Sequence, residues 1–436
     1  MAINYLTGDR DQQFLLPPDM REWLAEDHLV WFLLDVVDRF DLSEFERRSA
    51  DARGRRAYDP AVLVAVLIYA YCVGERSSRR IERRCHEDVA LRVAARNLAP
   101  DHTTLSRFVK DNADAFDALF VQVLALAAQA GLGKVGAIFV DGTKMPADAS
   151  PLAGRTREQI ENEVRRITTE ARETDTAEDE LLGAARGDEL PDELGDPRRR
   201  ATRLDQALRE LEEIEAVRAR RTDSKARKPP RANVTDPESR TVKGPRGFFF
   251  GYNAQAAVTG DGLIVAADVT QDTVDNAQFV PVVELAQDHL DDAGMAQPTD
   301  AVADNGYWSP GNASSDRLAD DKTGADGSTL SRPRPKPLIA PPRSKTRPKA
   351  NPDQPIPEDA GELQRMEHRL AQPDTKALYK LRSSTIEPVF GQIKANRGIT
   401  RFRRRGLAAA RNEWRLIATT HNLLKIWRIT QTHASI

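Results

Sequence analysis

The stretch Val135-Gly-Ala-Ile-Phe-Val140, followed by Asp141-Gly142, decides the fold of this chain. It is a short, mainly apolar run that ends at an acid and a glycine, which is the pattern of a buried strand. From residue 1 to about 130, by contrast, apolar residues recur at helical spacing. The chain therefore changes near residue 131 from an all-helical region to one that combines strands and helices.

Four further strand patterns follow the first. They are Phe248 to Val258, Leu263 to Val269, Ala301 to Asp304 and Pro337 to Pro341. Gly260-Asp-Gly262 supplies a turn between the first two of these, and an amphipathic helix from Phe279 to Leu290 comes before the third. Two segments rich in Pro, Lys, Ser and Asp, 316–336 and 342–361, are expected to be loops or partly disordered. The set predicts an α/β fold with a mixed five-stranded sheet flanked by helices.

A charged stretch from about Arg155 to Asp223 separates the first strand pattern from the second. It carries two narrow apolar stripes, Ile160, Val164, Ile167 and Ala171, and then Leu204, Leu208, Leu211 and Val217. Between the stripes lies an acidic segment with Gly and Pro, Asp175 to Pro197. Two heptad-like stripes joined by a polar loop predict an antiparallel helical hairpin, inserted into the α/β domain at about residues 152–225.

The N-terminal region reads as a series of short helices. Asp59-Pro60 is an N-cap followed by proline, and it opens an apolar helix that extends to Tyr71. Asp101 caps a later polar helix that carries Thr103, Thr104, Arg107 and Lys110. Short helices with a basic third member resemble a helix-turn-helix, in which Arg107 would contact DNA. A plain helical bundle with a solvated face remains the alternative.

The charge of the chain is unevenly distributed. The 436 residues carry a net charge of only −3, but Lys376 to Arg428 contains 13 Lys and Arg against two acids, a net of +11 that leaves −14 for the rest. A basic block of this kind indicates a surface for a polyanion or a disordered tail. Trp414, Trp427 and an apolar helical pattern, broken near Gly406, favour folded basic helices at 376–428.

Nothing in the composition indicates an exported or membrane protein. Cys72 and Cys85 have neither zinc-site nor disulfide spacing. The N-terminus has no basic-then-apolar signal pattern, and the longest apolar run, Ala61 to Val73, is too short to span a bilayer. A cytoplasmic protein with no membrane partner is expected.

Three acidic residues lie at positions that would suit the binding of metal ions. Asp141 and Asp304 come at the ends of two strand patterns, and Glu387 lies on a later helix. Three carboxylates that converge at the edge of a sheet can hold two Mg²⁺ ions roughly 4 Å apart, and Mg²⁺ prefers such hard oxygen ligands. A single aspartate after a strand can equally be a helix cap or a turn residue.

The residues around these acids form three motifs in a fixed order. The motifs are Asp141-Gly-Thr-Lys-Met145, Ala303-Asp-Asn-Gly-Tyr307 and Tyr379-x2-Arg382-x4-Glu387-x6-Lys394. This set resembles the DDE transposases of bacterial insertion sequences, which share the RNase H-like fold of retroviral integrases. The family has three residues between its Arg and Glu, whereas this chain has four between Arg382 and Glu387.

The resemblance covers most of the chain. Residues 16 to 110 resemble the InsH-type N-terminal transposase domain, through Leu16-Pro-Pro18, Glu26-Asp-His-Leu29 and Pro100-Asp-His-Thr-Thr-Leu-Ser-Arg-Phe108. Thr235-Asp-Pro-Glu-Ser-Arg240 and Gly251-Tyr-Asn-Ala-Gln255 are also similar to this group. The resemblance implies a helical DNA-binding domain at 1–130 and an RNase H-like catalytic domain at 131–430.

The resemblance also implies a reaction. Asp141, Asp304 and Glu387 would bind Mg²⁺, for which Mn²⁺ would substitute, and would cleave DNA at the transposon ends and join the freed 3′-OH to target DNA. The partners would be transposon-end and target DNA, bound by a homodimer. A metal-dependent nuclease that never joins strands, and a catalytically inactive DNA-binding protein, are the alternatives.

Further residues are candidates for contacts with DNA. Lys394 lies two helical turns after Glu387 and could bind a phosphate next to the metal ions, although a solvated lysine is also compatible with that position. Tyr379 could contact a DNA end or simply pack, and Arg382 belongs to the same motif. The densest cationic cluster is Arg401, Arg403, Arg404 and Arg405. Clustered arginines repel one another unless an anion lies between them, which favours phosphate binding.

Overall fold

The computed structural model describes residues 19–46, 57–166, 197–219, 229–244, 247–314, 318, 321–323, 329–344, 346–347 and 350–434. Leu16-Pro-Pro18, Ile167, Ala171 and most of the acidic segment after Asp175 lie outside these residues. The chain forms two compact units. The first comprises residues 1–71, 75–111 and 431–436, and the second comprises 72–74 and 112–430.

The first unit is helical, as predicted. Its helices are η1 (Met20–Trp23), α1 (Leu29–Val37), α2 (Ser43–Glu46), α3 (Pro60–Cys72), α4 (Ser78–Glu87), α5 (Val89–Ala94) and α6 (His102–Asp111). Helix α3 is buried from Val62 onward, which explains why its sequence is apolar all round. Asp101 caps α6 by accepting from the backbone N–H of Thr104 at 2.9 Å.

The second unit begins with helix α7 (Ala113–Gln129). The two compact units divide between Asp111 and Asn112, so this last helix of the region 1–130 lies in the second unit. Helix α7 packs on helix α11 (Phe279–Asp292) of the second unit, and it buries an apolar face that includes Phe116 and Phe120. The helix therefore belongs with the sheet rather than with the helices that precede it in sequence.

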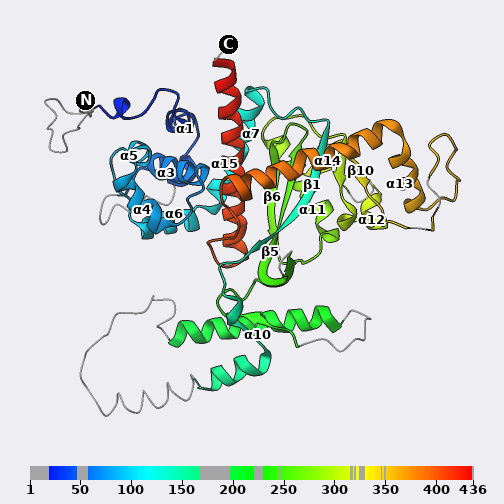
Figure 1. Ribbon diagram of the computed structural model, residues 1–436, viewed down its shortest axis with the longest axis horizontal. Coiled ribbons are helices and arrows are strands. Elements are labelled where there is room, and N and C mark those ends of the chain that lie inside the picture. The colour runs from blue at the N-terminus through cyan, green and yellow to red at the C-terminus, as the bar shows by residue number, and fades with distance from the viewer. Residues whose placement is uncertain are drawn as a thin grey trace, which may run out of the picture. The chain divides into compact units, whose positions relative to one another are not determined.

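The sheet has the predicted mixed topology (Figure 1). Its strands are β1 (Ala137–Pro146), β4 (Arg240–Gly244), β5 (Gly247–Thr259), β6 (Ile264–Thr270), β7 (Asp300–Ala303) and β10 (Lys336–Ile339). Five of them lie in the order β10-β7-β1-β5-β6, and β4 pairs with the first part of β5. β1 is parallel to β7 and antiparallel to β5. This arrangement is consistent with an RNase H-like fold.

Strand β1 continues beyond the apolar run that predicted it. It extends through Asp141 to Pro146, because the long strand β5 keeps pairing with it down to Gly251. The parallel pairing with β7 stops earlier, at Val140. A side chain at Gly251 would meet the carbonyl oxygen of Met145 at 2.4 Å, so the close approach of these two strands requires glycine there.

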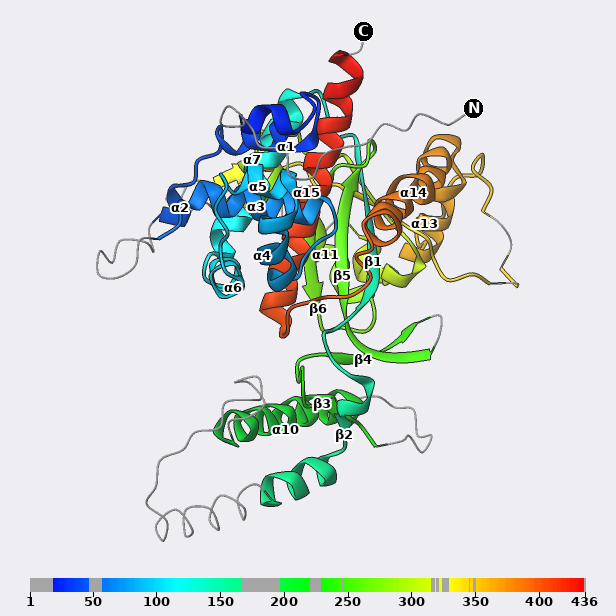
Figure 2. The same ribbon diagram turned by 60° about the vertical axis from the view of Figure 1, so that its left-hand side comes forward.

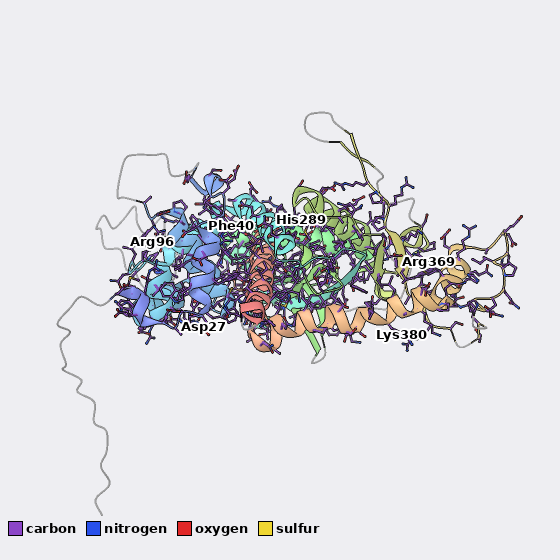
Figure 3. All side chains as sticks on the ribbon, turned by 90° about the horizontal axis from the view of Figure 1, so that it is seen from above. Asp27, Phe40, Arg96, His289, Arg369 and Lys380 are labelled. Carbon is purple, nitrogen blue, oxygen red and sulfur yellow. The ribbon has the colours of Figure 1, made fainter. Side chains whose placement is uncertain are left out.

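Helices cover both faces of the sheet (Figures 1 and 2). α11 packs on β6, β5 and β1, whereas α14 (Pro373–Gly391) packs against β1, β5 and β7 from the other side. Helix α13 (Glu362–Ala371) precedes α14. Its Arg369 forms an ion pair of 2.8 Å with Asp300 at the start of β7, and Lys380 of α14 is exposed (Figure 3).

Helix α15 (Leu407–Ala434) closes the free edge of the sheet. β6 pairs only with β5 among the described strands, which leaves backbone groups on its other edge without a strand partner. The Asn422 side chain accepts from the N–H of Ile264 at 2.9 Å and donates to its carbonyl at 2.8 Å. Arg415 and Arg411 donate to the carbonyls of Ala267 and Val269 further along β6.

The segment Thr235-Asp-Pro-Glu-Ser-Arg240 holds the start of α15. Asp236 accepts from the N–H of Gly406 at 3.2 Å, and Glu238 accepts from the N–H of Leu407 at 3.0 Å. The first N–H groups of a helix have no partner within the helix, and they favour negative charge nearby. This motif is therefore explained by helix capping.

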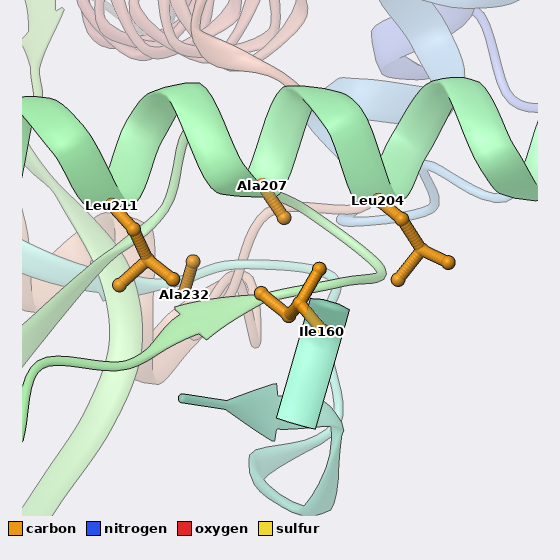
Figure 4. Close-up of a cluster of buried hydrophobic side chains, with 5 residues drawn as sticks. All are labelled: Ile160, Leu204, Ala207, Leu211 and Ala232. Atoms are coloured by element: carbon orange, nitrogen blue, oxygen red, sulfur yellow. The ribbon is translucent and has the colours of Figure 1, made fainter. Parts of the chain in front are cut away.

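The inserted hairpin has a small core of its own (Figure 4). Helix 157–166 packs against α10 (Pro197–Ala219), and the buried cluster consists of Ile160, Leu204, Ala207, Leu211 and Ala232. Arg157, at the start of the first helix, pairs with Glu212 and Glu215 near the end of α10, so the two helices run antiparallel. Val217 was expected in the apolar stripe, but it is 52% exposed.

One expected loop contains strands. Residues 316–336 were expected to be loop throughout, but β8 (Asp321–Thr323) and β9 (Thr329–Ser331) form a two-stranded antiparallel sheet. The polar sequence of these strands gave no apolar pattern from which to predict them. Hydrogen bonding between backbones does not require apolar side chains. Within the described residues, every helix is too short or too polar for a membrane span.

Candidate active site

Asp141 and Asp304 lie side by side at the sheet. The parallel register of β1 and β7 ends one residue before each of them, which puts the two backbones roughly 5 Å apart, as in any pair of neighbouring strands. The N–H of Gly142 donates to the Asp141 carboxylate at 2.8 Å, and the N–H of Gly306 donates to Asp304 at 2.8 Å. Each of the two carboxylates is therefore held by a backbone N–H group of its own segment.

The environment of Asp141 opposes its negative charge. Burial and the adjacent charge of Asp304 raise the pKa of Asp141 to about 6, and the charge of Asp275 adds to this rise. The N–H of Gly142 and the guanidinium of Arg382 lower the pKa without cancelling these effects. Burial and the neighbouring acids thus both disfavour an ionised Asp141, and a bound cation would stabilise the ionised carboxylate.

Helix α14 brings Glu387 and two other motif residues to the aspartates. Arg382 donates to Asp141 at 3.1 Å, and its other terminal nitrogen lies 3.9 Å from Glu387. Tyr379 lies one turn earlier on the same helix, near enough to Arg382 for the guanidinium to lower the pKa of its hydroxyl. Burial raises the pKa of the Tyr379 hydroxyl, and the charge of Asp304 also contributes. Arg382 therefore lies between Asp141 and Glu387.

The donor set suits a hard divalent ion. Asp141, Asp304 and Glu387 offer only carboxylate oxygens, which Mg²⁺ prefers. Across the described ranges, no three His, Cys, Asp or Glu side chains surround a single point closely enough to hold an ion. The Glu387 side chain is 61% exposed and that of Asp141 only 20%, and Arg382 lies between them.

Two family models match the chain. Residues 18–111 match the Transposase domain (DUF772), and residues 347–427, which include Glu387, match the Transposase DDE domain. The chain is a DDE transposase of the insertion-sequence type. It acts in DNA transposition, as a phosphoryl-transfer enzyme on DNA, and enzymes of this kind generally use divalent metal ions. No curated protein and no solved structure matches it.

In the transposase, Lys394 points toward the strand that carries the first aspartate. It lies on a π-helical turn, η6 (Gln392–Asn396), and its Nζ donates to Thr143 Oγ1 at 2.5 Å. Burial lowers the pKa of the Lys394 amine. The lysine is thus not a freely solvated one: it lies beside β1, two residues along from Asp141.

The arginine cluster has carboxylate partners within the transposase itself. Arg401 and Arg405 form ion pairs of 3.5 and 3.2 Å with Asp148. The buried Glu413 accepts from the backbone N–H groups of Arg403 and Arg404. We expected DNA phosphates to supply the negative charge between these arginines. Carboxylates of the protein therefore supply part of it. The Arg403 side chain is exposed.

Arg107 lies in the other compact unit. It is exposed on α6, as is Lys110 one turn later, while Leu105 and Val109 form the buried face of the helix. Helix α4 is also amphipathic, with Ile81 buried. Arg107 and Lys110 are thus placed on the solvated face of α6.

The sequence pointed to three acids and missed a polar cluster next to them. Its members are Lys144, Asn253, Gln255, Asp275 and Tyr307. A signal for it existed in the sequence. Asn253 and Gln255 interrupt the apolar pattern of β5, and each is only 1% exposed. Buried amides need hydrogen-bonding partners, so polar residues in a central strand predict a polar network around them.

Proposed function

We propose that this transposase cleaves DNA at the ends of its insertion sequence and joins the freed 3′-OH to target DNA, with Mg²⁺ bound by Asp141, Asp304 and Glu387. The observation that carries this proposal is the register of β1 and β7, which sets the two aspartates side by side under α14. The burial of Asp141 next to the charge of Asp304 supports cation binding there, because a cation would stabilise the ionised carboxylates. Mn²⁺ is expected to substitute.

The side chains of this site suggest a division of labour. When bound, the divalent ions would activate the attacking oxygen and stabilise the leaving oxygen. Asp141 and Asp304 supply carboxylates that their own backbone donors hold in place. Arg382 and Lys394 put positive charge beside the acids, where a DNA phosphate would lie, and a guanidinium can bind a phosphate through two parallel hydrogen bonds.

DNA binding would involve both compact units. We propose that the helical region 1–130 acts as the DNA-binding domain, through exposed basic residues of the first compact unit such as Arg107, and residues 131–430 as the catalytic domain, on whose helix α11 the last helix of that region, α7, packs. Tyr379 and the arginines at 401–405 would contact DNA near the cleavage site. Because two transposon ends must be processed together, the active form would be a homodimer. The reaction would take place in the cytoplasm.

Amide substitutions separate the chemistry from DNA binding. Asp141→Asn and Glu387→Gln keep the size of the side chain and remove one negative charge. We expect end cleavage and strand joining to fall at least about 100-fold, because the metal site is weakened, while DNA binding is retained or slightly tightened. Gel shifts and cleavage assays on the same preparation, with and without Mg²⁺, measure both quantities.

The control is Asp374→Asn, which changes an exposed acid on the same helix. It should cleave like the parent protein. Normal cleavage by Glu387→Gln would refute the three-acid site. Cleavage without joined products would favour a nuclease, and DNA binding without cleavage by the parent protein would favour an inactive binding protein.

A further inference from the structure

The carboxylate of Asp275 lies at the centre of the polar cluster beside the catalytic aspartates. It follows β6 and precedes the turn η3 (Asn276–Gln278). Its Oδ1 accepts three hydrogen bonds: from Lys144 Nζ at 3.0 Å, from Asn253 Nδ2 at 2.7 Å and from Gln255 Nε2 at 3.0 Å. Three donors on one oxygen, one of them charged, hold this carboxylate in one position.

Two motif glycines leave space for the carboxylates of this region. A Cβ added at Gly142 would lie 2.8 Å from Asp275 Oδ1 and 2.4 Å from the Gln255 amide nitrogen. A Cβ added at Gly306 would lie 3.0 Å from Asp304 Oδ1 and 3.5 Å from Asp275 Oδ2. Neither glycine has a positive φ. Their lack of a side chain is therefore explained by the space that these carboxylates need, and not by backbone conformation.

The cluster ties the sequence motifs of the catalytic unit together. Lys144 belongs to the first motif, only three residues after Asp141. Tyr307 belongs to the second, three residues after Asp304, and its buried hydroxyl donates to Gln255 Oε1. Gln255 in turn donates to Asp275. The segment of Asp141 is thus bonded to Asp275 directly, through Lys144. The segment of Asp304 is connected to Asp275 through Tyr307 and then Gln255.

We propose that Asp275 is a positioning residue of the transposase: it holds the Asp141 and Asp304 segments in the geometry that cleavage needs. The inference rests on the proposed function of those two aspartates. Lys144 is then an internal partner of Asp275, Gly142 leaves space for the Asp275 carboxylate, and Gly306 leaves space for the carboxylate of Asp304.

A double-mutant cycle tests the proposal. The variants are Asp275→Asn, which weakens the bond to Lys144, Gly142→Ala, which pushes on Asp275, and the two combined. The nearest atoms to the methyl group added in Gly142→Ala are the ends of flexible side chains, so this variant should fold. We expect each single variant to slow single-turnover end cleavage about 10- to 100-fold. The double variant should be scarcely slower than the slower single variant, because both changes disturb one cluster.

Three other measurements make the test specific. Gel-shift affinity for end DNA and the thermal unfolding midpoint should stay near those of the parent protein. Asp275→Glu keeps the charge but moves it by one methylene, so it should also cleave slowly. The matched control is Asp272→Asn, an exposed acid in the same loop whose carboxylate accepts from Gln278, and it should cleave normally.

The results distinguish this inference from the proposed function. If the parent protein cleaves and Asp275→Glu cleaves equally well, charge alone matters and the positioning role is wrong. Multiplicative losses in the double variant would also contradict it, since they would show independent effects. If Lys144→Met weakens DNA binding instead of slowing cleavage, Lys144 is a DNA contact and not a partner of Asp275. A parent protein that does not cleave would refute the proposed function itself.

Discussion

Neighbouring residues of β5 serve two different clusters. Asn253 and Gln255 donate to Asp275, whereas Tyr252, which directly precedes Asn253, donates to Asp236 at 2.7 Å. Successive side chains of a strand point to opposite faces of the sheet. The short motif Gly251-Tyr-Asn-Ala-Gln255 therefore supports the active site on one face and the capping of α15 on the other.

The buried Asp236 should make stability depend on pH. Burial raises its pKa to about 6, although the hydrogen bonds from Tyr252 and Gly406 act in the opposite direction. In the unfolded chain an aspartate has a pKa of about 3.9. Between these values the folded state binds more protons than the unfolded state, so the free energy of unfolding falls as the pH rises from about 4 to about 7.

Comparison with Asp236→Asn isolates this contribution. The variant lacks the titrating group, so its stability relative to the parent protein should increase over this pH range, by about 3 kcal/mol at most for a shift of roughly two pH units. Urea unfolding at a series of pH values measures the difference, with Asp272→Asn as the control. Parallel curves for the parent protein and Asp236→Asn would show that Asp236 does not titrate in this range.

At the scale of elements, the basic block at 376–428 is largely engaged in folding. Arg411 and Arg415 of α15 pair with Asp268 and Asp117 and also donate to carbonyls of β6. Arg382 pairs with Asp141. A local excess of +11 in the sequence is therefore reduced in the folded protein by acids from distant parts of the chain. DNA that binds to this block must therefore contact those of its Lys and Arg side chains that do not pair with acids of the protein.

The loop before α15 is the part of this block that should still bind DNA. Replacing Arg403, Arg404 and Arg405 with alanine should weaken binding about equally for all DNA sequences and reduce the salt dependence, by about one unit of slope per lost phosphate contact. Arg403→Ala alone should account for most of the effect, because its side chain is exposed and Arg405 is paired with Asp148.

The matched control for this loop is Arg411→Ala. It removes one positive charge from α15 that pairs with Asp268, so it should lower the unfolding midpoint without changing the salt slope. DNA titrations at several salt concentrations measure the slope for each variant. Unchanged affinity and slope for the triple variant would show that the arginine loop does not contact DNA.

At the scale of the whole molecule, the hairpin insertion has a buried core of its own, and Arg240 of β4 also joins it to the sheet through ion pairs with Glu210 and Glu213 of α10. Its buried cluster joins helix 157–166, α10 and β3 (Ala232–Asn233) and contains no residue of the six-stranded sheet. Leu211→Ala should therefore destabilise the hairpin by about 2–5 kcal/mol, as for other buried leucines, and leave the sheet intact. Val217→Ala, at an exposed site of the same helix, is the control.

Hydrogen exchange can locate this effect. In Leu211→Ala the amides of α10 should exchange faster, while those of β1 and β5 keep their protection. Loss of protection throughout the sheet would show that hairpin and sheet unfold as one cooperative unit. No loss in α10 would show that the hairpin derives its stability from elsewhere.

The sequence alone determined the elements whose signals are local. The apolar run before Asp141, the strand patterns of β5 and β6 with the Gly260–Gly262 turn, and the capped helices were all predictable, because periodicity and capping are properties of neighbouring residues. The three motifs also identified the family before any contact was known, because they are local patterns that follow one another in the family's order, although the spacing from Arg382 to Glu387 is one residue longer than in the family. Strands β8 and β9 were not predicted, because their polar sequences carry no local strand signal.

Only the tertiary structure decided what each charged residue contacts. The sequence placed Arg382, Lys394 and the arginines at 401–405 toward DNA, whereas the fold pairs several of them with carboxylates from distant segments, such as Asp141 and Asp148. It also brought Asp275 close to Asp141 and Asp304, although no motif marked it. The physical reason is that electrostatic pairing depends on distance in space, and residues far apart in the chain become neighbours only when the sheet is formed.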